Sequence, residues 1–176
     1  GKFTSNLLEV IEKAESAAEL FGSSYVGSEH IVFAMLNTPQ CTACKVMTDN
    51  GVEEGPYRAY FAHSIDQNSN IKGFTPRTKH MLMQAVELAV ELGGDDALAG
   101  TEHMLYAVMA EPTCLAMRIF NAMGVNLTRL ASRLEVAIHE GYNEDEGGFA
   151  EENPFASFFS AFGDNKQRAS QRQQNK

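Results

Sequence analysis

Apolar residues follow helical spacing in two regions of the chain. In the first region, the residues three or four positions apart are Leu7, Ile11, Ala14, Ala18 and Phe21. In the second region they are Leu82, Ala85, Ala89 and Leu92. This spacing predicts two amphipathic helices, each with one apolar face turned towards a core.

The sequence around these helices is repeated. Phe3-Thr4 corresponds to Phe74-Thr75, and the segment VGSEHIVFAML, which starts at Val26, corresponds to AGTEHMLYAVM, which starts at Ala99. The matching positions continue with Pro39 and Pro112, Cys41 and Cys114, Ala43 and Ala116, and Gly51-Val52 and Gly124-Val125. The chain therefore contains an internal duplication, with repeat one at about residues 3–66 and repeat two at about residues 74–140. Repeats of this size usually bury their apolar faces on each other.

Residues typical of helix ends stand at equivalent places in the two repeats. Thr4 and Thr75 are expected to cap the first helices, because a hydroxyl accepts an N–H of the first turn. Gly22 and Gly93 are expected to end them. Ser28 and Thr101 are expected to cap the second helices, with Glu29 and Glu102 in the first turn, where the helix dipole favours an acid.

The rest of each repeat predicts two more helices. A third helix runs from about Cys41, or from Thr113 in repeat two, to the Gly-Val pair. The fourth helix of repeat two begins after Asn126 and has an apolar face, whereas Gly55-Pro56 is expected to interrupt its counterpart. No strand-like alternation is present. The prediction is an all-α fold of about eight helices in two four-helix repeats related by a pseudo-twofold axis, followed by a flexible linker.

Composition excludes several functions. The net charge of −9 argues against a nucleic-acid surface, which needs clustered Lys and Arg. No apolar stretch approaches the roughly 20 residues of a membrane helix, and no signal peptide is evident, so we expect a cytoplasmic protein with no membrane partner. The three cysteines, an odd number, are expected to remain thiols in a reducing compartment.

The doubled pattern of Phe-Thr, Gly-(Ser/Thr)-Glu-His, an apolar helix and Gly-Val resembles the Clp N-terminal repeat domain, which heads AAA+ unfoldases that feed the Clp protease. The resemblance covers about residues 3–140. FTPRTKHML from Phe74 and GTEHMLYAVM from Gly100 are most similar to the ClpC and ClpA branch. The resemblance implies a Clp N-terminal domain at residues 1–141 and, at residues 142–176, a linker towards an ATPase domain absent from this chain.

This resemblance implies recognition without catalysis. The expected partners are protein substrates and adaptor proteins. The parent unfoldase is expected to form a hexameric ring that contacts the Clp protease, whereas the isolated domain is expected to be a monomer. No Walker loop is present, so ATP and Mg²⁺ are expected in the absent ATPase domains and no cofactor in this chain. In the domains that this chain resembles, the Glu of each motif helps to bind phosphorylated arginine on substrates. The resemblance implies that this role transfers to Glu29 with Thr4 and to Glu102 with Thr75, and Phe74 is expected to belong to the same contact region.

Other interpretations stay open. The Glu-His pairs could serve a metal-dependent helical enzyme, but adjacent helix residues point about 100° apart and lack the i, i+4 spacing of a zinc helix. A structural role, with each His bonded to a loop carbonyl and each Glu at a helix start, is the plainer alternative. The parent could also be a ClpB-type disaggregase. The lone Cys41-x-x-Cys44 is expected to supply buried thiols rather than a redox or zinc site.

The sequence changes character after Gly141. Residues 144–148 are acidic and glycine-containing, and residues 165–176 are almost entirely polar, which indicates a linker. Between them, Phe155, Phe158, Phe159 and Phe162 have the spacing of one helical face. This segment could pack on the domain or dock on a partner.

Overall fold

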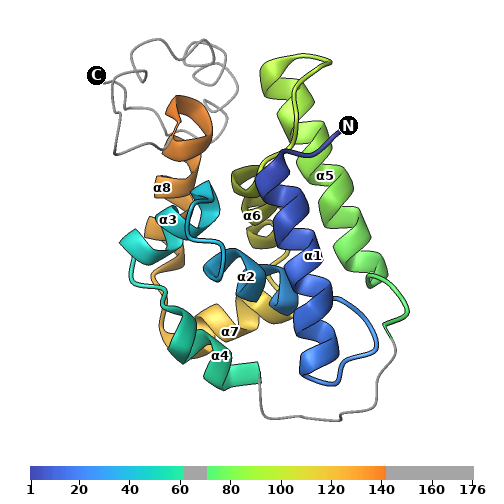
Figure 1. The fold of residues 1–176 in the computed structure, drawn as a ribbon. Helices are drawn as coiled ribbons and strands as arrows, with labels where there is room; N and C mark the ends of the chain where they lie inside the picture. Colours follow the sequence, from blue (N-terminus) through green and yellow to red (C-terminus); the bar gives the residue numbers. More distant parts are fainter. Residues whose placement is uncertain (62–70, 142–176) are drawn as a thin grey trace.

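The computed structural model describes residues 1–61 and 71–141, which form eight α-helices in two runs of four (Figure 1). The first run consists of α1 (Ser5–Leu20), α2 (Ser28–Leu36), α3 (Thr42–Asp49) and α4 (Glu54–Phe61). The second consists of α5 (Pro76–Gly93), α6 (Thr101–Met109), α7 (Leu115–Met123) and α8 (Leu127–Glu140). The predicted all-α fold is confirmed. The aromatic segment from Phe155 to Phe162 and the predicted linker lie outside the described residues.

Most predicted helix starts are confirmed. The Thr4 hydroxyl accepts the Leu7 N–H at 3.1 Å, and the Thr75 hydroxyl accepts the Thr78 N–H at the same distance. The prediction that Gly55-Pro56 interrupts the fourth helix is wrong. Because α4 begins at Glu54, Pro56 lies in the first turn, where a backbone N–H has no intrahelical partner to lose.

The second helices begin differently from the prediction. Their N-caps are Gly27 and Gly100, so the expectation that Ser28 and Thr101 cap these helices is wrong.

Both hydroxyls instead reach the opposite half. The Ala116 N–H donates to Ser28 Oγ at 3.0 Å, and the Ala43 N–H donates to Thr101 Oγ1 at 3.0 Å. Each half therefore supplies an acceptor to the start of the third helix of the other half, α7 or α3.

The extended segments before the helices also cross between the halves. The Thr4 N–H donates to the Ala99 carbonyl at 2.9 Å, which joins the start of α1 to the loop before α6. The Thr75 N–H donates to the Val26 carbonyl at 3.0 Å, which joins the start of α5 to the loop before α2. The same contact is thus made twice with the halves exchanged, as a pseudo-twofold relation requires.

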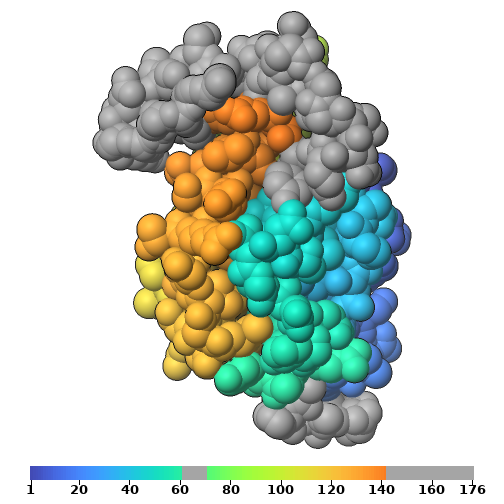
Figure 2. Space-filling view, turned by 90° about the vertical axis from the view of Figure 1, so that its left-hand side faces the viewer, coloured from blue at the N-terminus to red at the C-terminus, as the bar shows by residue number. Residues whose placement is uncertain are grey.

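Helix α2 lies near the centre of the molecule (Figure 1). Every residue from Ser28 to Leu36 is buried except Glu29. Helix α1 packs on α2, α5 packs on α6, and α8 lies beside α3 where the two halves meet (Figure 2). The central helix therefore brings Glu29 to the surface at its start while the rest of its length forms the core.

Candidate functional site

Glu29 is held against the backbone at the start of α2. A Cβ added to Gly27 would lie 2.5 Å from Glu29 Oε1, and a Cβ added to Gly100 would lie 2.5 Å from Glu102 Oε1. The two carboxylates therefore turn back over their N-cap glycines in the same way. The side chain of Glu29 keeps 17% of its exposure. Glycine is needed here for the close approach of the carboxylate.

The two histidines stabilise the same turns. The Gly27 N–H donates to His30 Nδ1 at 3.0 Å, and the Gly100 N–H donates to His103 Nδ1 at 2.9 Å. This contact is with a loop N–H, whereas the structural interpretation of the sequence expected a loop carbonyl. Burial lowers the pKa of His30 to about 4 and also lowers the pKa of His103. Since His30 is neutral, its 3.6 Å contact with Glu29 is no ion pair.

The structure pairs the predicted site residues across the halves. Glu29 and Thr75 line one cavity of about 290 Å³. Thr4 bonds to Ala99, beside the loop that leads to Glu102. The prediction that Glu29 accompanies Thr4 and that Glu102 accompanies Thr75 is therefore wrong. It failed because the repeat pattern does not reveal that each first helix starts beside the second helix of the other half.

The cavity at Glu29, here called the Glu29 pocket, combines polar groups of both charges with apolar flanks. Its lining residues are Ser23, Tyr25, Gly27, Ser28, Glu29, Thr75, Arg77, Thr78, Cys114 and Leu115.

The start of α5 supplies the donors of this pocket. Thr75 Oγ1 lies 2.7 Å from Thr78 Oγ1, so the two hydroxyls form one hydrogen-bonded pair. Pro76 has no N–H, and the Thr78 N–H is bonded to Thr75. The Arg77 N–H and the Arg77 guanidinium are therefore donors that can meet a ligand, beside the one hydroxyl hydrogen of Thr75 or Thr78 that their shared bond does not use.

Burial raises the pKa of Glu29 above its ordinary value. A cationic ligand group would favour the ionised carboxylate. The pocket therefore places a carboxylate that suits a cation beside a helix start and an arginine that suit an anion. Such an arrangement fits one ligand side chain carrying both charges.

Several of these residues were not predicted as site residues. Arg77 stands in the first turn directly after Thr75-Pro76, a position that could have identified it. Tyr25 and Leu115 are 46% and 43% exposed, and they flank the pocket with apolar surface. Phe74, which was predicted, forms a backbone bridge with Val26 while its side chain packs against the core. It positions the start of α5.

Tyr57 stabilises the backbone at Glu29. Its buried hydroxyl donates to the Glu29 carbonyl at 2.9 Å, and its ring lies 6.0 Å from that of Phe120. Leu130 occupies the equivalent buried position in the second half and has no hydroxyl to offer. This support is therefore specific to the first half.

The cysteines are core residues. Cys41, Cys44 and Cys114 are buried free thiols, which confirms the sequence prediction. The Cys44 N–H donates to Cys41 Sγ at 3.4 Å, and burial raises the pKa of Cys44 to about 11. Within residues 1–61 and 71–141 no group of three or more His, Cys, Asp or Glu side chains could hold a metal ion.

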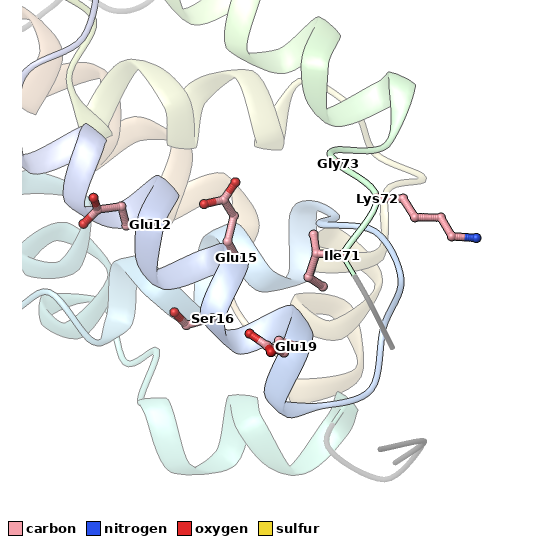
Figure 3. Close-up of a pocket in the computed structure, with 7 residues that line it drawn as sticks. All are labelled: Glu12, Glu15, Ser16, Glu19, Ile71, Lys72 and Gly73. Atoms are coloured by element: carbon pink, nitrogen blue, oxygen red, sulfur yellow. The ribbon is translucent and has the colours of Figure 1, made fainter. Parts of the chain in front are cut away.

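A second cavity, of about 650 Å³, lies along α1 (Figure 3). Glu12, Glu15 and Glu19 line it from the helix, and the Lys72 side chain points away from them. All three glutamates are exposed. They form the ordinary solvated face of an amphipathic helix.

Comparison with known proteins places this geometry in a family. The sequence model of the Clp repeat (R) N-terminal domain matches residues 2–70 and 73–176, which is most of the chain and includes both repeats. The chain belongs to this family.

In the part of the chain that the structure describes, no helix is long and apolar enough to cross a membrane.

Relatives and solved structures extend this finding. A ClpA homologue from Trieres chinensis, an ATP-binding subunit of the ATP-dependent Clp protease, is 27% identical over 147 residues, which cover 81% of this chain and 16% of that protein. The N-terminal domain of Hsp104 from Candida albicans matches with a TM-score of 0.66 at 15% identity, over 81% of this chain and 95% of that one. A ClpV N-domain in complex with a VipB peptide matches with a TM-score of 0.61 at 17% identity, over 88% and 90% of the two chains. This Clp N-domain thus spans only a small part of its curated relatives.

Proposed function

We propose that this Clp N-domain is a non-catalytic recognition domain that binds substrate segments or adaptor proteins for an ATP-dependent Clp-type unfoldase. The observation that carries the proposal is the Glu29 pocket, where Glu29 lies beside the start of α5 and Arg77. A ClpV N-domain, whose fold this chain shares, has been solved with a peptide bound.

The ligand that suits the site best is phosphorylated arginine on a substrate protein. Its phosphate would accept from the first turn of α5, and its guanidinium would meet the Glu29 carboxylate. In the other half, Glu102 and Thr4 are the corresponding carboxylate and helix start, without a counterpart of Arg77. A ligand carrying both charges on one side chain suits these sites better than free phosphate, which would bring an anion close to a carboxylate.

The proposal also covers the parent protein, of which this domain would be the N-terminal part. ATP and Mg²⁺ would act in ATPase domains outside this chain, in a hexameric ring that delivers substrates to the Clp protease in the cytoplasm. A disaggregase parent is the alternative, because the matched folds include an Hsp104 domain.

Calorimetric titration of phosphoarginine into the wild-type chain and the Glu29→Ala/Glu102→Ala double variant tests the proposal. Losing a carboxylate that meets a guanidinium costs about 1.5 to 3 kcal/mol, or roughly ten- to a hundredfold in affinity, so the double variant should show almost no binding. Lys79→Ala is a matched control, because Lys79 is exposed on α5 and lines neither cavity. Equal affinities for wild type and the double variant would remove both glutamates from the site, and a wild-type chain that does not bind would refute phosphoarginine as the ligand.

A further inference from the structure

The starts of α1 and α5, which are equivalent in the two halves, carry different side chains. The start of α5 carries Pro76-Arg77, whereas the start of α1 carries Ser5-Asn6. We propose that the sites are unequal: the Glu29 pocket is the primary one for a side chain that carries a phosphate beside a guanidinium, and Arg77 determines this preference. The inference rests on the proposed function and adds which half does the binding.

Arg77 is placed at the rim of the Glu29 pocket. It is one of the lining residues, and its Nε lies 3.4 Å from Glu111 Oε1. Glu111 comes three residues before Cys114, which also lines the pocket. The guanidinium is therefore held along the border of the cavity, and its side chain keeps 47% of its exposure.

Asn6 gives the other site a different character. It is neutral, and its Oδ1 accepts a hydrogen bond from Gln40 Nε2 at 3.3 Å. Ser5 stands at the position equivalent to Pro76. Because serine has a backbone N–H and proline has none, the start of α1 has one more N–H donor than the start of α5. The site at Glu102 thus offers an anion only neutral donors from its helix start, whereas the Glu29 pocket offers a full positive charge.

The charge difference decides between the sites. A hydrogen bond between guanidinium and phosphate is charge-assisted and often bidentate, and is about twice as strong as a neutral one. The additional N–H at α1 replaces only part of this interaction. Since Arg77 is half exposed, we expect a preference of about tenfold for the Glu29 pocket, at the modest end of what a charged contact gives.

Glu111 limits the affinity of the primary site. Its carboxylate holds the Arg77 guanidinium and would compete with a phosphate for it. Thr38, which has no charge, stands at the equivalent position in the first half. Replacing Glu111 by Gln should therefore tighten binding at the Glu29 pocket and leave the site at Glu102 unchanged.

Calorimetric titration of phosphoarginine into the whole chain and its single variants tests the inference. Glu29→Gln and Arg77→Asn should each weaken the tight binding event about tenfold, Glu102→Gln should preserve it, and Glu111→Gln should strengthen it severalfold. Asn6→Arg, measured in the Glu29→Gln background, should restore affinity by creating the missing charge at the other site. Thermal melts of each variant check that the fold is intact.

The outcomes separate this inference from the function on which it rests. Equal affinity at the two sites, or no effect of Arg77→Asn, would overturn the preference while leaving the recognition function in place. A wild-type chain that binds no phosphoarginine would overturn both. Tight binding that is lost with Glu102→Gln and kept with Glu29→Gln would reverse the assignment of the primary site.

Discussion

Removing the Thr101 hydroxyl should destabilise the domain although Thr101 is far from α3 in the sequence. Thr101→Val keeps the shape and the branching of the side chain while it deletes the acceptor of the Ala43 N–H, which lies 3.0 Å from Thr101 Oγ1. Thr101 keeps 2% of its exposure and Ala43 none, so water has little access to the abandoned N–H.

The magnitude follows from the burial of that group. Leaving a buried donor unsatisfied costs about 1 to 3 kcal/mol, and Val adds no cavity because it fills the volume of Thr. Ser28→Ala removes the acceptor of the Ala116 N–H and should cost a similar amount. The two bonds share no partner, so the double variant should lose about the sum of the two.

Urea denaturation followed by circular dichroism measures these changes. Thr128→Val is the matched control, because Thr128 is exposed on α8, and it should change the free energy of unfolding by less than about 0.5 kcal/mol. If Thr101→Val and Ser28→Ala are as stable as that control, the crossed hydroxyls do not hold the halves together, and the reasoning from the two bonds is refuted.

Three further predictions concern the pH response, the tail and the N-cap glycine. The pKa of His30 is about 4 in the folded state and has its ordinary value of 6.5 in the unfolded state. Between pH 4 and pH 6.5 the unfolded chain therefore binds more protons than the folded chain. The free energy of unfolding should fall as the pH is lowered from 6.5 to 4. His30→Gln should make this dependence shallower by up to about 1.4 kcal/mol per pH unit in urea titrations, whereas an unchanged slope would contradict a neutral His30. Truncation after Gly141 should leave the thermal midpoint within about 2 °C, since the sequence of residues 142–176 is too short and too polar to form a core of its own. A larger drop in calorimetry would show that the tail packs as part of the domain. Gly27→Ala should displace the Glu29 carboxylate, because the new Cβ would lie 2.5 Å from Glu29 Oε1. The variant should therefore bind phosphoarginine more weakly, with little change in the melting temperature. Unchanged binding would show that the ligand does not use this position of the carboxylate.

Much of the fold was predictable because local signals agree with one another. Helical spacing and the Thr4 and Thr75 caps depend only on residues a few positions apart. The duplication is visible because the same pattern occurs twice in the sequence. The error at Gly55-Pro56 arose because proline is harmful inside a helix but harmless in its first turn, and sequence alone did not place the start of α4 at Glu54.

The site was less predictable because it is built from both repeats. Glu29 and Thr75 were identified individually, but their partnership depends on backbone bonds between the loop before α2 and the segment before α5. The same crossing explains why Ser28 and Thr101 bond to the opposite half and leave the N-cap positions to glycine. Side-chain patterns do not encode which copy of a repeat supplies the neighbour.

The central claim, that this Clp N-domain binds its ligand where Glu29 meets the start of α5, is tested most directly by amide chemical shifts. Uniformly ¹⁵N-labelled protein would be titrated with phosphoarginine, and shifts would be mapped on the assigned spectrum. We predict that the largest changes occur at Gly27, Glu29, Thr75, Arg77 and Thr78, with smaller changes around Thr4 and Glu102. Changes confined to other surfaces, such as the acidic face of α1, or no changes at saturating ligand, would contradict the claim.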